Sequence, residues 1–160
     1  MMLTMLRQGE SSLITRIGGK PETRQFLENL AVELGISERV LLPGVIPDVA
    51  AQIERAALFL LTSYSEGVSN ALIEALASGL PVISTDVPSG GTVELMTDGE
   101  NGLVIPTGDQ EALVRAMDKL LGDPVYADQL GREAAKIQER LEPQHVNLLW
   151  REYFDEIILK

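Results

Sequence analysis

Two carboxylates separated by seven residues, Glu66 and Glu74, are the side chains best placed to do chemistry in this sequence. Glu74 lies in 71–77, a segment rich in Ala and Leu, where we expect a helix that is apolar almost all round and therefore buried. A carboxylate there is costly unless something accepts its charge or its hydrogen bonds. Glu66 precedes Gly67 and the expected helix start, where free N–H groups and the helix dipole favour an anion. These features suggest a site that reads hydroxyl groups with carboxylates and holds phosphate with backbone N–H groups.

The runs on either side of this segment predict the elements that position the two carboxylates. Residues 56–61 and 80–83 are short and apolar, which is typical of strands buried on both faces in a parallel sheet. Between them the expected helix ends at Gly79, a stop signal, with Pro81 just beyond it. The result is a strand–helix–strand unit with a right-handed crossover. Ligands of such sheets bind beyond the carboxyl ends of the strands, where Glu66 is expected.

The rest of the chain also alternates strands and helices, which predicts an α/β fold with one doubly wound parallel sheet. Further strands are expected at 12–17, 40–42 and 103–105, and helices at 21–34, 49–55, 92–96, 109–121 and 124–141. A last helix carries a one-sided apolar stripe, which is most simply core: Val146, Leu149, Trp150, Tyr153, Phe154 and Ile157. Residues 1–7 look like the stub of a helix cut at a boundary.

Composition and charge disfavour several classes of protein. The 160 residues carry a formal net charge of −11, which argues against binding nucleic-acid backbones and against docking on anionic lipid. The lack of Cys fits a reducing compartment, no apolar run is long enough to span a bilayer, and a cytoplasmic location is expected. The glycine patterns of dinucleotide-binding and P-loop proteins are absent, which disfavours an oxidoreductase or an ATPase.

Residues 66–75, followed by 78–86, resemble the Glu-x7-Glu signature of retaining glycosyltransferases of the GT-B fold, family 4. The order of elements from Leu13 to Tyr153 is similar to the C-terminal, Rossmann-like half of these two-domain enzymes. The resemblance implies transfer of a glycosyl group from a nucleoside diphosphate sugar, with uridine diphosphate favoured, to an acceptor hydroxyl in polysaccharide or glycolipid synthesis. It also implies that residues 1–160 form one nucleotide-sugar-binding domain whose partner, the N-terminal acceptor domain, is absent, so the isolated chain is expected to be inactive.

The resemblance assigns roles to individual residues around the signature. Glu66 is the expected catalytic residue, which orients the donor sugar through its hydroxyls without acting as a nucleophile, and Glu74 is expected to bind the ribose hydroxyls. Donor-binding backbone groups are expected between them, at Gly67, Val68, Ser69, Asn70 and Ala71. Ser69 could also cap the helix, and both roles are compatible. The usual Phe-Pro-Asn of the family is Val-Ser-Asn here, which leaves the sugar open.

Two further loops belong to the expected donor site. Gly18, Gly19 and Lys20 resemble a loop near the phosphates, where Lys20 either supplies a cation or is simply a solvated turn residue. A second loop resembles the segment that cradles the base: Pro43, Gly44 and Val45. No Asp-x-Asp pair occurs, so neither a metal nor another cofactor is expected. The charge of the diphosphate would be met by N–H groups, a helix dipole and basic side chains.

The alternative from a different class is a Rossmann-like module that binds or interacts without catalysis. In the family that the chain resembles, the last helix crosses back to the N-terminal domain, so part of its apolar stripe would be exposed as an interface. Residues 89–92 resemble another loop of the family without its usual Arg, so their role in binding stays open. The single histidine, His145, is expected at the surface rather than in catalysis.

Overall fold

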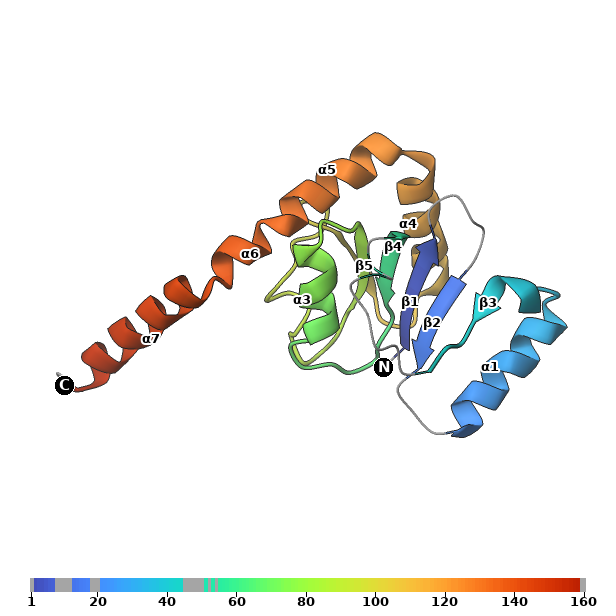
Figure 1. Cartoon of the computed structure of the whole chain (residues 1–160), viewed down its shortest axis with the longest axis horizontal. Coiled ribbons are helices and arrows are strands. Elements are labelled where there is room, and N and C mark those ends of the chain that lie inside the picture. The colour runs from blue at the N-terminus through green and yellow to red at the C-terminus, as the bar shows by residue number, and fades with distance from the viewer. Residues whose placement is uncertain are drawn as a thin grey trace.

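A six-stranded sheet with helices against both faces forms the body of the protein (Figure 1). The computed structural model describes residues 2–7, 13–17, 21–44, 51, 53 and 55–158. The sheet order is β3-β2-β1-β4-β5-β6. The strands are β1 (Met2–Arg7), β2 (Leu13–Ile17), β3 (Val40–Leu41), β4 (Ala56–Leu61), β5 (Val82–Asp86) and β6 (Leu103–Pro106). The helices are α1 (Pro21–Glu33), α3 (Asn70–Ala77), α4 (Gln110–Gly122), α5 (Pro124–Ala135), α6 (Ile137–Arg140) and α7 (Pro143–Ile158), with a short 3-10 turn, η1 (Ser37–Arg39).

The strands of the sheet run in one direction with a single exception among those described. β4, β5 and β6 are mutually parallel, and β2 is parallel to β3. β1 is antiparallel to both of its neighbours, with Leu3 opposite Arg16 on β2 and opposite Leu61 on β4. β2 and β4 therefore point the same way, and the carboxyl ends of β2, β3, β4, β5 and β6 share one edge. The predicted doubly wound α/β fold is confirmed, with one antiparallel strand inserted at its centre.

The core consists of two apolar layers, one on each face of the sheet. Alternate residues of β4 divide between them, as the period of a strand requires. Phe59 and Leu61 pack with Leu72 and Leu76 of α3, whereas Leu58 packs with apolar side chains of α4 and α5 on the other face. Five of the six β4 residues are buried, so the prediction of a strand covered on both faces is correct.

Three predicted elements differ in kind from the structure, and the strand predicted at 80–83 instead runs from Val82 to Asp86 as β5. Residues 2–7 form β1 instead of the stub of a helix, because this short apolar segment pairs its backbone with strands on both sides. The predicted helix at 92–96 is a series of hydrogen-bonded turns. The predicted helix at 124–141 is broken at Lys136, whose N–H bonds the carbonyl of Glu133, three residues back. Of the predicted helix at 49–55, most residues lie outside the described part of the chain.

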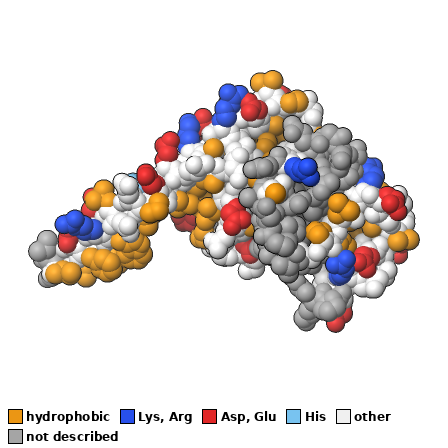
Figure 2. Space-filling model, viewed as in Figure 1, with side chains coloured by type: hydrophobic (Ala, Val, Ile, Leu, Met, Phe, Trp, Pro, Cys, Tyr) orange, Lys and Arg blue, Asp and Glu red, His pale blue; other side chains and the backbone are white. Residues whose placement is uncertain are grey.

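α5, α6 and α7 form an arm that carries the end of the chain away from the sheet (Figure 1). The apolar stripe of α7 is exposed, contrary to its simplest interpretation as core. Trp150, Tyr153 and Phe154 are each more than half exposed and contact one another, with the rings of Trp150 and Phe154 stacked at 5.6 Å. Figure 2 shows hydrophobic side chains gathered along one side of the arm. α7 is thus an amphipathic helix whose apolar face has no cover from the described residues.

Candidate functional site

The turn from β4 into α3 is shaped by a capped helix start. Ser69 is buried, and its side-chain oxygen accepts a hydrogen bond from the N–H of Leu72 at 3.4 Å. The carbonyl of Ser69 accepts from the N–H of Ile73 at 3.1 Å. The N–H groups of Asn70 and Ala71 have no acceptor within the helix, as expected for the first turn. The predicted N-cap is confirmed, and it leaves these two N–H groups for another acceptor.

The end of α3 also follows the sequence signal. Gly79 has a φ of +71°, and its N–H bonds the carbonyl of Leu76 at 2.9 Å. The N–H of Leu80 bonds the carbonyl of Ala75, so the helix closes with the wrapped ending that a left-handed glycine permits. α3 is held at both ends, and its position against β4 is fixed by Leu72, Ala75 and Leu76, which are all buried.

Glu74 is exposed, and the expectation that its carboxylate is buried is wrong. α3 buries one face against β4, and Glu74 lies on the other side of the helix. Asn70 is also exposed, and because it lies four residues earlier the two side chains share one helix face. The apolar composition of 71–77 indicated burial correctly for the helix but not for this residue. The physical reason for placing a ligand at Glu74 therefore no longer holds, and its role depends on the resemblance and on its position.

Glu66 is half-buried, and one of its carboxylate oxygens is enclosed. Oε1 of Glu66 is buried without a hydrogen-bond partner in the described part of the chain, and so is the hydroxyl oxygen of Ser63. A buried polar atom without a partner costs about 1–3 kcal/mol, and more when it is charged. Both atoms belong to residues at the carboxyl end of β4, three positions apart in the sequence, where the structure tolerates unpaired polar groups.

Hydrogen bonds connect the loop that carries Glu66 to the end of β5 and to the loop that follows it. The Thr85 hydroxyl donates to the carbonyl of Ser63 at 2.6 Å. The Ser89 hydroxyl donates to the carbonyl of Glu66 and accepts from the N–H of Glu66 at 3.4 Å. Thr92 is buried and donates to the carbonyl of Thr85 at 2.9 Å. This hydrogen bond stabilises the loop that follows β5 and carries Ser89. The backbone at Glu66 is thus held by a side chain that lies 23 residues later.

Gly91 allows the two loops to approach each other. A Cβ at Gly91 would lie 2.6 Å from the carbonyl carbon of Gly67, closer still to its oxygen, and 3.1 Å from the carbonyl oxygen of Glu66. No side chain fits there, and the groups in the way are backbone. The sequence assigns no role to residues 89–92, so Ser89 and Gly91 are missing from the predicted site. The signal that could have found them is a Ser-Gly-Gly run directly after the neighbouring strand.

Of the remaining predicted site residues, four are described by the structure and four are not. Pro43 and Gly44 follow β3 at the same sheet edge as Glu66, and Gly44 adopts a φ of +73°. β3 and β4 are separated by three strand spacings, or roughly 14 Å. Gly67 and Val68 are exposed beside Glu66, and no atom lies within 4 Å of a Cβ at Gly67. The other four predicted residues lie outside the described residues: Gly18, Gly19, Lys20 and Val45.

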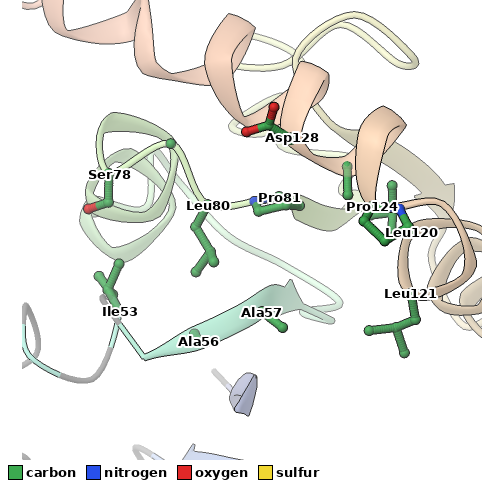
Figure 3. A pocket seen from close by; sticks show the side chains of 12 residues that line it. Ile53, Ala56, Ala57, Ser78, Leu80, Pro81, Leu120, Leu121, Pro124 and Asp128 are labelled. Atoms are coloured by element: carbon green, nitrogen blue, oxygen red, sulfur yellow. The ribbon is translucent and has the colours of Figure 1, made fainter. Parts of the chain in front are cut away.

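Two of the hollows formed by described residues lie at opposite edges of the sheet. One, of about 250 Å³, lies at the carboxyl edge between Tyr64 and the start of α4. The other, of about 430 Å³, lies at the opposite edge, where β4 begins. Figure 3 shows that apolar side chains dominate this second hollow, among them Ile53, Leu80 and Leu120. Its one carboxylate, Asp128, is paired with Arg132. The predicted site residues lie at the other edge, so this apolar hollow is not part of the candidate site.

Two features bear on metals and membranes. Among the described residues, no group of three or more His, Asp or Glu side chains could hold a metal ion. None of the described helices combines the length and the hydrophobicity that are needed to cross a membrane.

Comparison with known proteins identifies the family. Residues 2–137 match the family described as "Glycosyl transferases group 1". The lipopolysaccharide core biosynthesis glycosyltransferase LpsE of Rhizobium meliloti is 37% identical over 105 residues, which cover 66% of this chain and 30% of LpsE. The D-inositol 3-phosphate glycosyltransferase of Nocardia farcinica is 42% identical over 110 residues, which cover 68% of this chain and 24% of that enzyme. The chain thus spans less than a third of the length of these two relatives.

A solved structure with the same fold is Anabaena Alr3699/HepE, crystallised in complex with UDP and also with UDP-glucose. The complex with UDP superposes on this chain with a TM-score of 0.79 at 22% sequence identity. The alignment covers 88% of this chain and 38% of HepE. The antiparallel β1 therefore does not prevent a close match in fold.

Proposed function

This chain belongs to the glycosyl transferases group 1 family, and from that premise we propose that it is the donor-binding domain of a retaining glycosyltransferase. The observation that carries the proposal is the enclosed, unpaired Oε1 of Glu66 at the carboxyl end of β4, beside the open start of α3. The Glu66 carboxylate would accept a hydrogen bond from a hydroxyl of the donor sugar, and the donor is a nucleoside diphosphate sugar. The acceptor is a hydroxyl group of a growing polysaccharide or glycolipid.

The start of α3 would hold the donor phosphates. The N–H groups of Asn70 and Ala71 are free of the helix, and they stand at the positive end of its dipole. Neighbouring backbone at Gly67, Val68 and Ser69 would face the sugar. This arrangement meets negative charge without a metal, by fixed N–H donors in a preformed loop.

The nucleoside would extend from α3 toward β3. Glu74 shares its helix face with Asn70 and is exposed, so its carboxylate is free to accept hydrogen bonds from the ribose hydroxyls. Pro43, Gly44 and Val45 would contact the base, and the roughly 14 Å between β3 and β4 suits the span of a nucleotide. Gly18, Gly19 and Lys20 would lie beside the diphosphate, which makes β2 the third strand of the site.

Catalysis would need a second domain. The relatives are more than three times as long as the part that this chain matches. The exposed apolar face of α7 supports a partner domain of the same enzyme, because a face of this size is unfavourable in water. Residues 1–160 by themselves are expected to bind donor without turnover, in the cytoplasm where nucleotide sugars are made available.

Calorimetric titration of the chain with uridine, guanosine and adenosine diphosphates, and then with uridine diphosphate glucose, tests the proposal. Glu74→Ala should weaken binding of the nucleotide itself. Glu66→Ala should leave nucleotide binding intact and remove the additional affinity that the sugar provides. The control is Glu111→Ala, an exposed glutamate in the first turn of α4. Absence of heat with all three nucleotides would contradict donor binding and favour an interaction module.

A further inference from the structure

We propose that Ser89 positions the carboxylate of Glu66 for the donor sugar, an assignment that rests on the proposed function. Ser89 lies in the loop after β5, and its hydroxyl bonds the backbone of Glu66. Because it acts through Glu66, Ser89 is a positioning residue and needs no contact with the donor. The sugar part of donor binding should therefore depend on Ser89, whereas the nucleotide part should not.

The loop that carries Glu66 is held at its two ends and has little apolar packing in between. Ser63 and Ser69, which lie on either side of it, are both buried. The carbonyl of Ser63 accepts from the Thr85 hydroxyl at 2.6 Å, and Ser69 caps α3. Of the five residues between them, four are exposed and Glu66 is half-buried. Burial of apolar side chains therefore does not fix the backbone at Glu66, and hydrogen bonds must do so.

The Ser89 hydroxyl bonds the backbone on both sides of the Glu66 Cα. It accepts from the N–H of Glu66 at 3.4 Å and donates to the carbonyl of Glu66. The N–H belongs to the peptide plane before the Cα, and the carbonyl belongs to the plane after it. Because φ and ψ are the two soft dihedral angles of a residue, hydrogen bonds to both planes restrain both angles. Ser89 thus restrains the direction in which the Glu66 side chain leaves the loop.

The turn that carries Ser89 is itself well anchored. The N–H of Gly90 bonds the carbonyl of Val87 at 3.0 Å, which closes a β-turn. Pro88 occupies the first corner of this turn, where its fixed φ favours the turn conformation. Val87 before the corner and Thr92 after it are buried. The turn is therefore a rigid support, from which Ser89 holds a loop that has less packing of its own.

A close backbone contact beside Ser89 has a separate effect. A Cβ at Gly91 would lie 3.1 Å from the carbonyl oxygen of Glu66, so the two loops already stand close together. Contact of this kind limits how near the loops come. The hydrogen bonds of Ser89 add direction, because their strength depends on the angle as well as on the distance. Distance and direction are thus set by different residues of the same loop.

Calorimetric titration of the 160-residue chain tests the role of Ser89. Uridine, guanosine and adenosine diphosphates are each compared with their glucose esters, and the ratio of the two affinities measures what the sugar adds. Ser89→Ala should leave the affinity for the nucleotide unchanged and lower this ratio about two- to tenfold, the range for one net hydrogen bond. Ser89→Thr keeps the hydroxyl and should retain the ratio. Because Ser89 is exposed, the urea midpoint of Ser89→Ala should change little, which separates positioning from a loss of stability.

A double-mutant cycle shows whether Ser89 acts through Glu66. Glu66→Ala alone should remove the affinity that the sugar adds. In that background, Ser89→Ala should cause no further change in the ratio, because the carboxylate that it positions is gone. Losses that add up in the double variant would show that Ser89 acts on the donor by itself, and would overturn the positioning role.

A matched control variant removes a similar hydrogen bond elsewhere. Ser78 is also exposed, and its hydroxyl donates to the carbonyl of Glu74 at 2.7 Å, at the far end of α3. Ser78→Ala should leave the ratio unchanged. An unchanged ratio in Ser89→Ala, with normal binding of the nucleotide, would overturn the positioning role alone. Absence of heat with all three nucleotides and their glucose esters would contradict the proposed donor function instead.

Discussion

Replacement of Gly91 by alanine is the sharpest test of how the site is built. The added methyl group would lie 2.6 Å from the carbonyl carbon of Gly67, whereas ordinary contacts of this kind begin at 3.4 Å. The two loops must separate by at least 0.8 Å, the difference between these distances. Gly91 does not adopt a positive φ, so the clash, and not backbone strain, sets the sign of the effect.

The expected magnitude follows from the kind of atom that must move. Overpacking of a fitted interior costs about 1–3 kcal/mol. Replacing glycine also restricts the unfolded chain, which returns about 0.4–1 kcal/mol. We therefore expect Gly91→Ala to lower the free energy of unfolding by about 1–2 kcal/mol. Because the displaced loop carries Glu66 and Gly67, the affinity for uridine diphosphate glucose should fall on the order of tenfold or more.

Gly131 provides a matched control. A Cβ there would lie 3.1 Å from the carbonyl carbon of Gly79 and closer still to its oxygen, so Gly131→Ala also forces backbone apart. This contact joins α5 to the end of α3, away from the edge where Glu66 lies. A second control, Gly122→Ala, meets no atom within 4 Å and should be neutral or slightly stabilising.

Urea denaturation gives the stability of the three variants, and calorimetry gives their affinity for the nucleotide sugar. Gly131→Ala should lose stability without a comparable loss of affinity, whereas Gly91→Ala should lose both. If Gly91→Ala binds the nucleotide sugar as tightly as the unaltered chain, the contact between the two loops does not position the site. Equal losses of affinity in both variants would show that stability alone is responsible.

Further predictions concern single side chains. Asn101→Ala should lower the free energy of unfolding by about 1–2 kcal/mol in urea titrations, because its side chain bonds the N–H of Thr97 at 2.7 Å and the carbonyl of Leu95 at 3.0 Å. Leu72→Ala should cost about 2–5 kcal/mol by the same measurement, since it leaves a cavity between α3 and β4. Trp150→Ser should change the urea midpoint of the monomer little, because the ring is 55% exposed; a large loss would contradict the open face of α7.

The sequence predicted the unit from β4 to β5 well, for local physical reasons. A continuous apolar run can be buried on both faces only inside a sheet, and Gly79 is a helix ending that needs no tertiary partner. The orientation of Glu74 was beyond such reasoning. The Ala- and Leu-rich composition of an eight-residue helix does not tell which side meets the strand, and Leu72 and Leu76 decided it.

The remaining errors share a tertiary origin. The spacing of apolar residues in α7 indicates an apolar face, but it does not show which other surface packs against that face. Residues 2–7 have no helix or strand signal strong enough to outweigh pairing on two sides. Ser89 and Glu66 meet across 23 residues of sequence, so no local pattern connects them. In each case the missing information is the identity of a distant neighbour.

The central place of β1 has a consequence for the order in which the protein can assemble. Its first partner, β2, follows closely in the sequence, so the hairpin of β1 and β2 can form early in the folding of this domain. Its other partner, β4, begins at Ala56, and the pairing of Leu6 with Leu58 closes a long stretch of chain. Until β4 pairs with it, the edge of β1 that faces away from β2 has unpaired backbone groups. Pairing across such a sequence distance is slow, and an unpaired strand edge can associate with other chains. We therefore expect refolding yield to depend on protein concentration, with the closure of β1 against β4 as the limiting step.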